Sequence, residues 1–484
     1  MKVRNSISRK PLLMKTMPQR ESLVKDMLHL MEASRDGFGQ GRVYLRAVLM
    51  ALAEVLSFGS HHVTDLLRSV GLVEEDWTAW YRLLQQPSRM DEGVLGAALV
   101  GQTWEVVRET GVYVVGLDST SVPRNSQQLE GTSWLKCPRN PPWKVGIHRG
   151  QRFLNVSWLA PLERGYSRAI PLRFLPCFPE KAVLKAHEAQ VEPQTGATAL
   201  RWVRETVDEH DPNLPVLCLV DGSYDRPAFW NGLPGKTTVL ARTAKNRKLM
   251  FLPPPYAGRG RRRKYGARAP APQDYLAQTD GWQSFSVLVR GQQRRMVARV
   301  EGPFLRATMP DTPLMLICVR GQTWQAAQGK RRREPVYYLV NAVQGQDGQW
   351  RLPLPLETLL AWAWQRWELE VVHREVKSGF GLGDKQCFNP HAAVTSVQWS
   401  AWVYSLLTFT AYRQLGAATL VKRATAWQRH PRRWTLHTVL DAFRRELTTQ
   451  PDFSWLRSPS TSMWQKIEAH LLKLTSPSLR LALF

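Results

Sequence analysis

Cysteine is scarce in this chain. The 484 residues include five cysteines, which stand far apart at positions 137, 177, 218, 318 and 387. No two of them form a CxxC pair, and no Cys/His spacing matches a zinc ligand set. The sequence therefore supports neither a zinc finger nor a disulfide framework, and it predicts a protein of the reducing cytoplasm.

Features of secreted and membrane proteins are also lacking. The N-terminus has no apolar stretch followed by a small-residue cleavage site, and we find neither a basic amphipathic helix nor a lipid-attachment motif. The uncharged run 389–412 is long enough to cross a membrane. It contains His391, Gln398 and several Ser and Thr, however, which favours a buried core helix. The sequence predicts no membrane association.

Acidic residues are outnumbered throughout the chain. Forty Asp and Glu stand against 66 Lys and Arg, which gives a net charge of +26. The excess occurs in clusters along the whole length, at 2–10, 258–266, 330–334 and 429–434. Because 43% of the residues are hydrophobic, the chain can still bury a large core. A folded protein with such dispersed positive charge is expected to bind a polyanion over a wide surface.

The hydrophobic pattern changes along the chain and predicts five regions. Residues 1–110 have helical periodicity. Three strand-like runs, a helix, a strand, a second helix and a further strand then follow, and this order predicts a mixed α/β sheet over 111–244. Residues 245–334 are rich in Pro, Gly and Arg with short strand-like pieces, as in a basic β-rich insertion. A strand and a long helix resume the core over 335–390, and 391–484 is predicted to be helical.

The helix predicted around 366–385 carries two different faces. Four apolar residues at helical spacing predict its packed face: Leu369, Val372, Val376 and Phe380. Arg366, Glu370 and Lys377 fall within about 40° of one another at 100° per residue, and Arg374 lies beside them. Glu375 falls about 140° away from Glu370 and cannot share that face. An Arg with a Glu four residues later is also an ordinary helical ion pair, so this face has two interpretations.

Two aspartates follow strand-like runs. Asp118 ends the run 112–118, and Asp221 follows the run beginning at 216. Either one alone is also typical of a turn. Together with Glu370 in a basic surround, they form a set of oxygen ligands suited to two Mg²⁺ or Mn²⁺ ions, which can promote phosphodiester displacement. Arg366 and Lys377 would then contact phosphates.

These residues resemble the bacterial insertion-sequence DDE transposases of insertion-sequence family four and its 701 sister group. The family hallmark is Tyr, two residues, Arg, three residues, Glu, six residues, Lys, and this chain has Arg366, Glu370 and Lys377 at those places. The resemblance covers about 110–390 and includes LDSTSVP after the first strand and VDGSYDRPAFW around Asp221. It departs at the hallmark Tyr, which is replaced by Ala363.

The resemblance implies an α/β fold with an RNase H-like mixed-sheet core, interrupted by a β-rich insertion and flanked by helical N-terminal and C-terminal regions. It implies that Asp118, Asp221 and Glu370 are catalytic metal ligands. It also implies an aromatic residue from the end of the insertion that stacks on a flipped base, and Tyr337 is nearest by position. Arg242, after the strand that follows Asp221, is a further expected DNA contact.

The expected function is cut-and-paste DNA transposition. A homodimer would bind the inverted-repeat ends of its own element in double-stranded DNA, and would cleave and join them. The N-terminal helices would recognise the ends. Two alternatives remain open at this point, namely a domesticated DNA-binding protein without catalysis and an RNase H-like nuclease that cuts without joining. The cytoplasmic nucleoid is the expected location.

Overall fold

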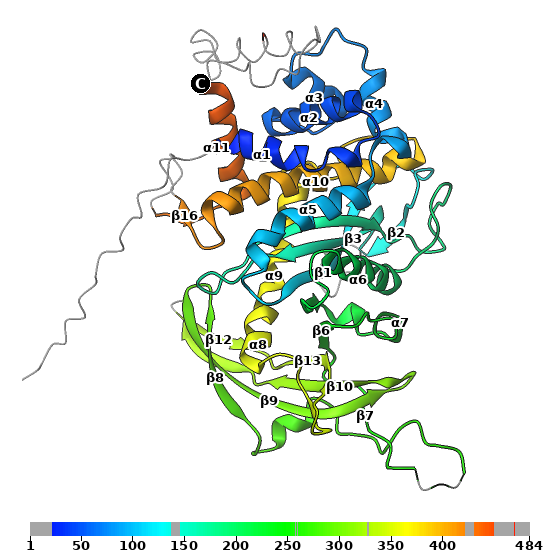
Figure 1. The fold of residues 1–484 in the computed structure, drawn as a ribbon, viewed down its shortest axis with the longest axis vertical. Helices are drawn as coiled ribbons and strands as arrows, with labels where there is room; N and C mark the ends of the chain where they lie inside the picture. Colours follow the sequence, from blue (N-terminus) through cyan, green and yellow to red (C-terminus); the bar gives the residue numbers. More distant parts are fainter. Residues whose placement is uncertain are drawn as a thin grey trace, which may run out of the picture.

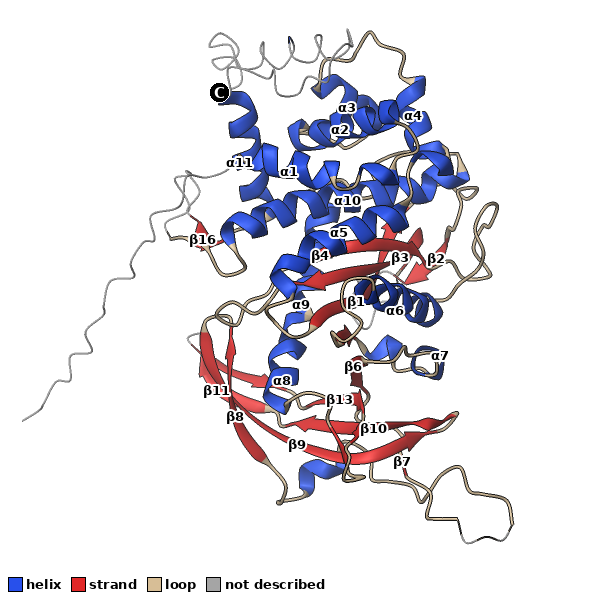
Figure 2. Cartoon of the chain, viewed as in Figure 1, coloured by secondary structure: helices blue, strands red, loops and turns tan. Residues whose placement is uncertain are grey.

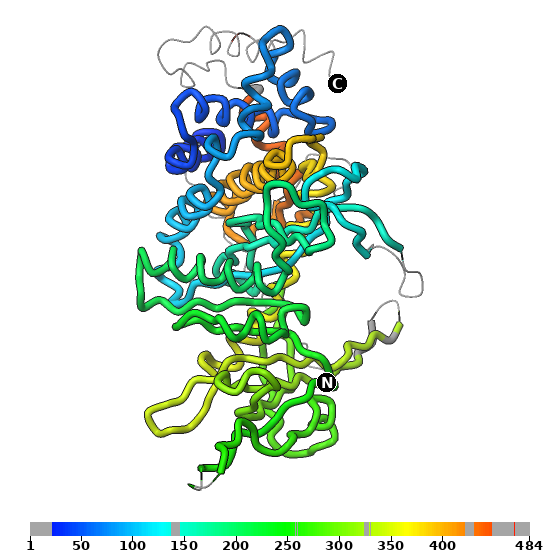
Figure 3. Tube along the Cα trace, turned by 90° about the vertical axis from the view of Figure 1, so that its right-hand side faces the viewer, coloured from blue at the N-terminus to red at the C-terminus, as the bar shows by residue number. Residues whose placement is uncertain are grey.

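The computed structural model describes residues 22–136, 146–256, 258, 260–326, 329–421, 430–449 and 469. The basic cluster at 2–10 and the predicted helical tail beyond 449, apart from residue 469, lie outside this part of the chain. Figure 1 shows an elongated molecule with three layers along its long axis. Helices from both ends of the sequence form one end, a sheet lies in the middle, and long strands form the other end. The turned view in Figure 3 shows the same order.

The N-terminal region is helical, as predicted. It contains α1 (Leu23–Glu32), α2 (Gly41–Leu56), α3 (Val63–Ser69), α4 (Thr78–Gln85) and α5 (Glu92–Val107), with short 3-10 turns at Arg35–Gly37 and Pro87–Arg89. The residues that precede α1 and α5 explain why these two helices begin where they do. The Ser22 side chain accepts a hydrogen bond from the Lys25 amide, and Asp91 accepts from the Gly93 and Val94 amides. Both caps satisfy amides that would otherwise lack a partner in the first turn.

The central sheet contains the predicted strands in their predicted order along the chain, and one short strand, Ser133–Lys136, is additional. Its strands are β1 (Tyr113–Pro123), β2 (Ser133–Lys136), β3 (Ile147–Leu159), β4 (Ala169–Pro176), β5 (Val216–Val220) and β6 (Thr237–Thr243), with α6 (Glu192–Asp208) before β5. β3 pairs antiparallel with both β1 and β4, whereas β5 runs parallel to β1 and to β6. All five residues of β5 are buried, as expected for a central parallel strand.

The same sheet continues into the region predicted as an insertion. β13 (Val336–Asn341) pairs antiparallel with β6, and β10 (Met309–Val319) and β9 (Gln292–Arg306) follow it. β7 (Met250–Phe251) and β8 (Gln283–Val289) both pair with β9, while β11 (Gln322–Ala326) and β12 (Gly329–Arg333) form a separate hairpin. Figure 2 shows β8, β9 and β10 as a curved layer beyond β6. Residues 245–334 are thus β-rich, and β13 joins their strands to the core.

The helix that carries Glu370 is divided in two. The sequence predicts one long helix, whereas the structure has α8 (Leu356–Gln365) and α9 (Trp367–Ser378) on either side of Arg366. The Leu369 amide donates to the Arg366 carbonyl, three residues back, so the regular four-residue ladder is interrupted there. The predicted apolar stripe of α9 is confirmed, because Leu369, Val372 and Val376 are buried, as is Phe380 just beyond it.

The C-terminal helices complete the helical end. α10 (Pro390–Leu415) packs against β4, α1 and α4, and α11 (Leu436–Thr449) against α1 and α2. The buried helix predicted over 389–412 is therefore confirmed. Within the described ranges, no helix is both long enough and apolar enough to cross a membrane.

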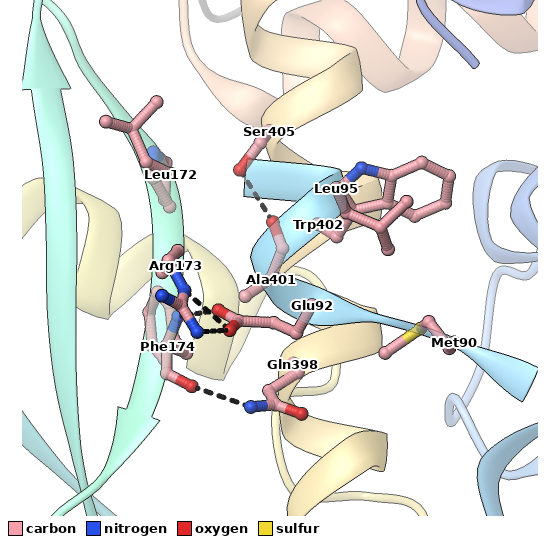
Figure 4. A pocket seen from close by; sticks show the side chains of 11 residues that line it. Met90, Glu92, Leu95, Leu172, Arg173, Phe174, Gln398, Ala401, Trp402 and Ser405 are labelled. Atoms are coloured by element: carbon pink, nitrogen blue, oxygen red, sulfur yellow. Dashed lines mark hydrogen bonds and ion pairs between the residues drawn. The ribbon is translucent and has the colours of Figure 1, made fainter. Parts of the chain in front are cut away.

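Two ion pairs connect these layers, one partly buried and one fully buried. Glu92 in the first turn of α5 pairs with Arg173 of β4 at 2.5 Å, beside a small cavity of about 10 Å³ (Figure 4). Glu54 of α2 lies 2.6 Å from the Lys385 ammonium and accepts a hydrogen bond from the Trp399 indole at 3.0 Å. Glu54 thereby joins the N-terminal helices to the loop after α9 and to α10.

Removing Glu54 is expected to destabilise the whole fold. Both Glu54 and Lys385 are almost completely buried, so Glu54→Ala leaves an unpaired buried ammonium group. We expect a loss of about 3–5 kcal/mol in the free energy of unfolding, measured by chemical denaturation. Glu334→Ala is the control, because its pair with Arg332 is solvent-exposed and its loss should leave stability nearly unchanged. Equal stability of the two variants would contradict a structural role for Glu54.

Candidate active site

The pairing of β1 with β5 places Asp118 beside Asp221. The parallel register ends at Leu117 opposite Val220, and the two aspartates are the next residues on their strands. β5 stops there, and Asp221 accepts a hydrogen bond from the Ser223 amide at 2.7 Å. β1 continues to Pro123 in its pairing with β3. The prediction that Asp118 ends its strand is therefore wrong. β5 ends just before Asp221, whereas β1 continues for five residues beyond Asp118.

A glycine in β1 allows α9 to approach this point. A Cβ atom on Gly116 would lie 2.8 Å from a terminal carbon of Leu369, which is closer than side-chain contacts allow. Residues 116 and 118 share a face of the strand because side chains alternate. The helix next to Gly116 therefore lies on the side to which Asp118 points, and Glu370 follows Leu369 directly.

Arg366 connects the two segments. Its guanidinium donates to Glu370 at 2.7 Å and to Asp118 at 3.4 Å. The sequence allowed Arg366 to be either a partner in an ordinary helical ion pair or part of a site with Asp118. The two are compatible, because Arg366 pairs with Glu370 on its helix and also contacts Asp118 on the strand. The three groups are only partly exposed, at 24% for Arg366, 36% for Glu370 and 16% for Asp118.

A neutral histidine borders Asp118. Burial, followed by the charges of Lys377 and Arg366, lowers the pKa of His373 to about 3. Its Nε2 atom lies 3.3 Å from the Asn155 amide nitrogen, and Ser157 donates to the Asn155 carbonyl oxygen. This orientation makes Asn155 the donor, so the proton of His373 lies on Nδ1, 4.0 Å from an Asp118 oxygen.

The carboxylates of the site influence one another. The pKa of Asp118 is raised to about 7, first by burial and then by the negative charges of Asp221, Glu192 and Glu370, against the opposing effect of Arg366. Glu192, at the start of α6, contacts Ser223 at 2.9 Å and Arg152 at 3.1 Å. The sequence analysis did not include Glu192, because nothing in its local pattern relates it to Asp221.

Two other nearby acids are structural. Asp225, four residues after Asp221, is buried between Arg306, Arg247 and the Thr243 hydroxyl. Glu375 is buried on the far side of α9, where it contacts Arg168 at 2.9 Å and the Tyr404 hydroxyl at 2.6 Å. The helical register that excluded Glu375 from the Glu370 face agrees with this position.

The remaining basic residues predicted to contact DNA differ in how far they are exposed to solvent. Arg374 is exposed on α9 and Arg242 is exposed on β6. Lys377 is half-buried, and its charge lowers the pKa of His148, after the larger effect of burial, as well as that of His373. Arg374 and Lys377 thus extend the charged face of α9 away from Arg366, whereas Arg242 lies beyond β5.

An open pocket adjoins Arg366 on the Arg242 side. Its volume is about 190 Å³, and its lining combines arginines with aromatic rings: Arg242, Arg333, Arg366, Tyr338, Trp364 and Trp367. The Arg333 guanidinium stacks on the Trp364 ring at 4.0 Å. Tyr337, the aromatic residue nearest by position, is 5% exposed and does not line this pocket. Tyr338 does, because it pairs directly with Arg242 and neighbouring residues of a strand face opposite sides.

The described residues contain no group of three or more His, Cys, Asp or Glu placed to hold a metal ion as they stand. At this site Arg366 bridges Asp118 and Glu370, and its positive charge occupies the position between the strand and the helix. The donor atoms that face it are carboxylate oxygens, which hard divalent cations prefer.

No protein-family model matches the sequence, and no curated protein matches it. Among solved structures, the chain is similar to the piggyBac transposase in a synaptic complex with hairpin DNA. The identity is 11% and the TM-score 0.37, and the match covers 94% of this chain and 83% of that one.

Enlarging Gly116 should disturb the site selectively. A Gly116→Val side chain would collide with Leu369 and push α9 away from β1, which separates Glu370 from Asp118. We expect loss of any activity that requires both carboxylates, while thermal unfolding remains cooperative at a somewhat lower temperature. Gly235→Val is the control, because no atom lies within 4 Å of the added Cβ position. Full activity of Gly116→Val would contradict the proposed dependence on helix position.

The stability of the metal-free protein should depend on the ionisation of Asp118. Its folded pKa of about 7 lies above its ordinary value of 3.8, so wild-type stability is expected to fall as the pH rises from 3.8 to about 7 and to level off above that. Asp118→Asn removes this loss. The melting temperature of the variant relative to wild type should therefore be higher at pH 8 than at pH 5. Asp280→Asn, at an exposed position, should show no such pH-dependent difference.

Proposed function

We propose that this chain is a DNA transposase that cleaves and joins DNA ends by metal-dependent phosphodiester displacement. The observation that carries the proposal is the juxtaposition of three carboxylates from distant parts of the sequence. The β1–β5 register brings Asp118 beside Asp221, and Arg366 links Asp118 to Glu370 across the helix. Two carboxylates at a strand–strand step, with a third from a helix, suit a pair of divalent ions.

Asp118, Asp221 and Glu370 would hold Mg²⁺ or Mn²⁺. Two such ions supply activation of the attacking oxygen and stabilisation of the leaving oxygen. The donor set fits, because its ligands are carboxylate oxygens and because the neighbouring negative charges that raise the pKa of Asp118 would also attract a cation. Glu192 adds negative charge at the same place.

The surrounding side chains have separate roles in this proposal. Arg366 would exchange its carboxylate partners for a phosphate of the bound strand, a group that a guanidinium can hold through two hydrogen bonds. His373 would remain neutral beside Asp118, since its pKa of about 3 excludes an additional positive charge there at neutral pH. Arg374 and Lys377 would contact the backbone on one side of Arg366.

The aromatic pocket on the other side of Arg366 would receive an unpaired base. Tyr338, Trp364 and Trp367 offer ring faces or edges, and Arg242 and Arg333 offer charge near the phosphate of that nucleotide. In this chain Ala363 stands at the hallmark Tyr position and also lines the pocket, so it widens the space next to Trp364. Tyr338 replaces Tyr337 in the proposed stacking role.

The fold supports the same class of protein. The strand order β4, β3, β1, β5, β6, with β3 antiparallel and β5 and β6 parallel to β1, is the arrangement expected of an RNase H-like core. We place the chain with insertion-sequence family four and its 701 sister group on the hallmark residues. Its partners would be duplex DNA ends and target DNA, bound by a homodimer in the bacterial nucleoid.

Substitution of the carboxylates tests the catalytic assignment. Asp118→Ala, Asp221→Ala and Glu370→Gln are each expected to abolish Mg²⁺-dependent cleavage of duplex DNA that carries the ends of the proposed element. DNA binding should persist, because phosphate contacts supply affinity independently of the metal. Glu357→Gln is the matched control for Glu370→Gln, since it is an exposed glutamate on the preceding helix α8. Full cleavage by any one of the three variants would overturn the assignment.

A strand-transfer assay separates the proposal from its two rivals. The wild-type protein is expected to join the 3′ ends that it produces to a target plasmid. Cleavage without joined products would indicate a nuclease. Metal-independent binding without any cleavage would indicate a DNA-binding protein that has lost catalysis.

A further inference from the structure

Four arginines surround a pocket in the N-terminal helices. Arg42 and Arg46 come from α2, Arg82 from α4 and Arg89 from the 3-10 turn that follows α4. The space between them measures about 140 Å³, which is several times the roughly 30 Å³ that one water molecule occupies. The remaining lining is apolar and consists of Val43, Ala79 and Leu83. The pocket therefore has room for an anion of several atoms and a wall that is otherwise uncharged.

Two of the arginines are held by hydrogen bonds, and none of the four is paired directly with a carboxylate in the described ranges. The described lining of the pocket includes no acidic residue. Instead, neutral amide oxygens hold two of them in place. Arg42 donates to the Gln40 side chain at 2.8 Å, and Arg89 donates to Gln86 at 2.7 Å and to Gln40 at 3.4 Å.

Other arginines in the same region are paired with acids. Arg35 lies 3.1 Å from Glu32, and Arg68 lies 3.4 Å from Asp65. The pocket arginines thus differ from these neighbours in making no ion pair with a carboxylate within the described ranges, although the charge of Arg82 helps to lower the pKa of the nearby Asp76.

This arrangement is electrostatically unfavourable without an anion. Arg42 and Arg46 are four residues apart on one helix, where like charges repel. Arg46 is half-buried, and burial together with the charges of Arg42 and Arg89 lowers its pKa. A phosphate group would relieve this repulsion, because guanidinium groups can each donate two hydrogen bonds to its oxygens.

We infer that this arginine pocket binds a backbone phosphate of duplex DNA, at a contact separate from the carboxylate site. The inference rests on the proposed function only in taking DNA as the partner. The pocket is accessible to DNA from solvent, since Arg42 and Arg82 at its edge are exposed. Figure 1 places α2 and α4 at one end of the long axis, whereas β1 and α9 lie toward its middle. A duplex bound at both places would contact two separated parts of the protein surface.

Salt-dependent DNA binding tests the inference. The double variant Arg46→Ala/Arg82→Ala is compared with the wild type by fluorescence anisotropy on a labelled random-sequence duplex. We expect about tenfold or greater weakening at low salt and a log–log salt slope that is shallower by about 1 to 2. The matched control Arg35→Ala/Arg68→Ala loses the same charge from ion-paired positions of the same region and should keep the wild-type slope. Equal effects of the two double variants would overturn the inference.

Thermal unfolding separates a binding role from a structural one. Removing two of four neighbouring like charges should leave the melting temperature of Arg46→Ala/Arg82→Ala unchanged or higher. If this variant instead unfolds at a lower temperature, the exposed-site variant Arg82→Ala alone still reports on DNA affinity. Unchanged affinity and slope in Arg82→Ala would then overturn the inference.

Free phosphate is the competing ligand. Stabilisation of the wild type by inorganic phosphate, lost in the double variant while DNA affinity stays unchanged, would overturn the DNA assignment. Failure of the proposed function is distinguishable from either result. A wild-type protein that binds DNA through this pocket but never cleaves it would contradict transposition and leave the arginine pocket intact.

Discussion

Parallel hydrogen bonding between β1 and β5 is the constraint on which the candidate site depends. The register ends at Leu117 opposite Val220, so the next residue on each strand is an aspartate. The two aspartates are thus placed side by side by the pairing of the residues that precede them. Glu370 joins them because Gly116, two residues before Asp118, leaves room for Leu369 against the strand. One strand pairing and one missing side chain therefore bring together residues that are separated by about 250 positions in the sequence.

The balance of positive and negative charge differs between parts of the molecule. Buried acids such as Glu54, Glu375 and Asp225 each contact a buried cation, and these pairs join layers of the fold. At the candidate site, in contrast, Arg366 is shared by two carboxylates, and the neighbouring acids raise the pKa of Asp118. In the arginine pocket of the N-terminal helices, positive charges outnumber negative ones. A negative excess at one place and a positive excess at another suit a metal ion and a phosphate backbone respectively.

Much of the fold could be predicted from the sequence. The helical N-terminal region, the succession of strands and helices along the core and the apolar stripe of α9 follow from local periodicity, which is strong in long amphipathic elements. The face shared by Arg366 and Glu370 also follows from helical spacing. The break at Arg366 could not be predicted, because a single three-residue turn leaves the periodicity intact. The continuation of the sheet through β13 into β10 and β9 also depends on pairing between distant strands, which short-range patterns do not record.

By itself, the sequence determined which residues are candidates for the proposed chemistry, because residue type, helical spacing and position after a strand-like run are local properties. Asp118, Asp221, Glu370 and Arg366 are candidates of this kind. Only the tertiary structure decided which neighbours complete the site. It placed Glu192 beside Ser223, turned Tyr338 rather than Tyr337 toward the pocket, and gathered Arg42, Arg46, Arg82 and Arg89 without an acid. Strand register and helix packing bring such residues together, and neither is encoded within any short segment of the chain.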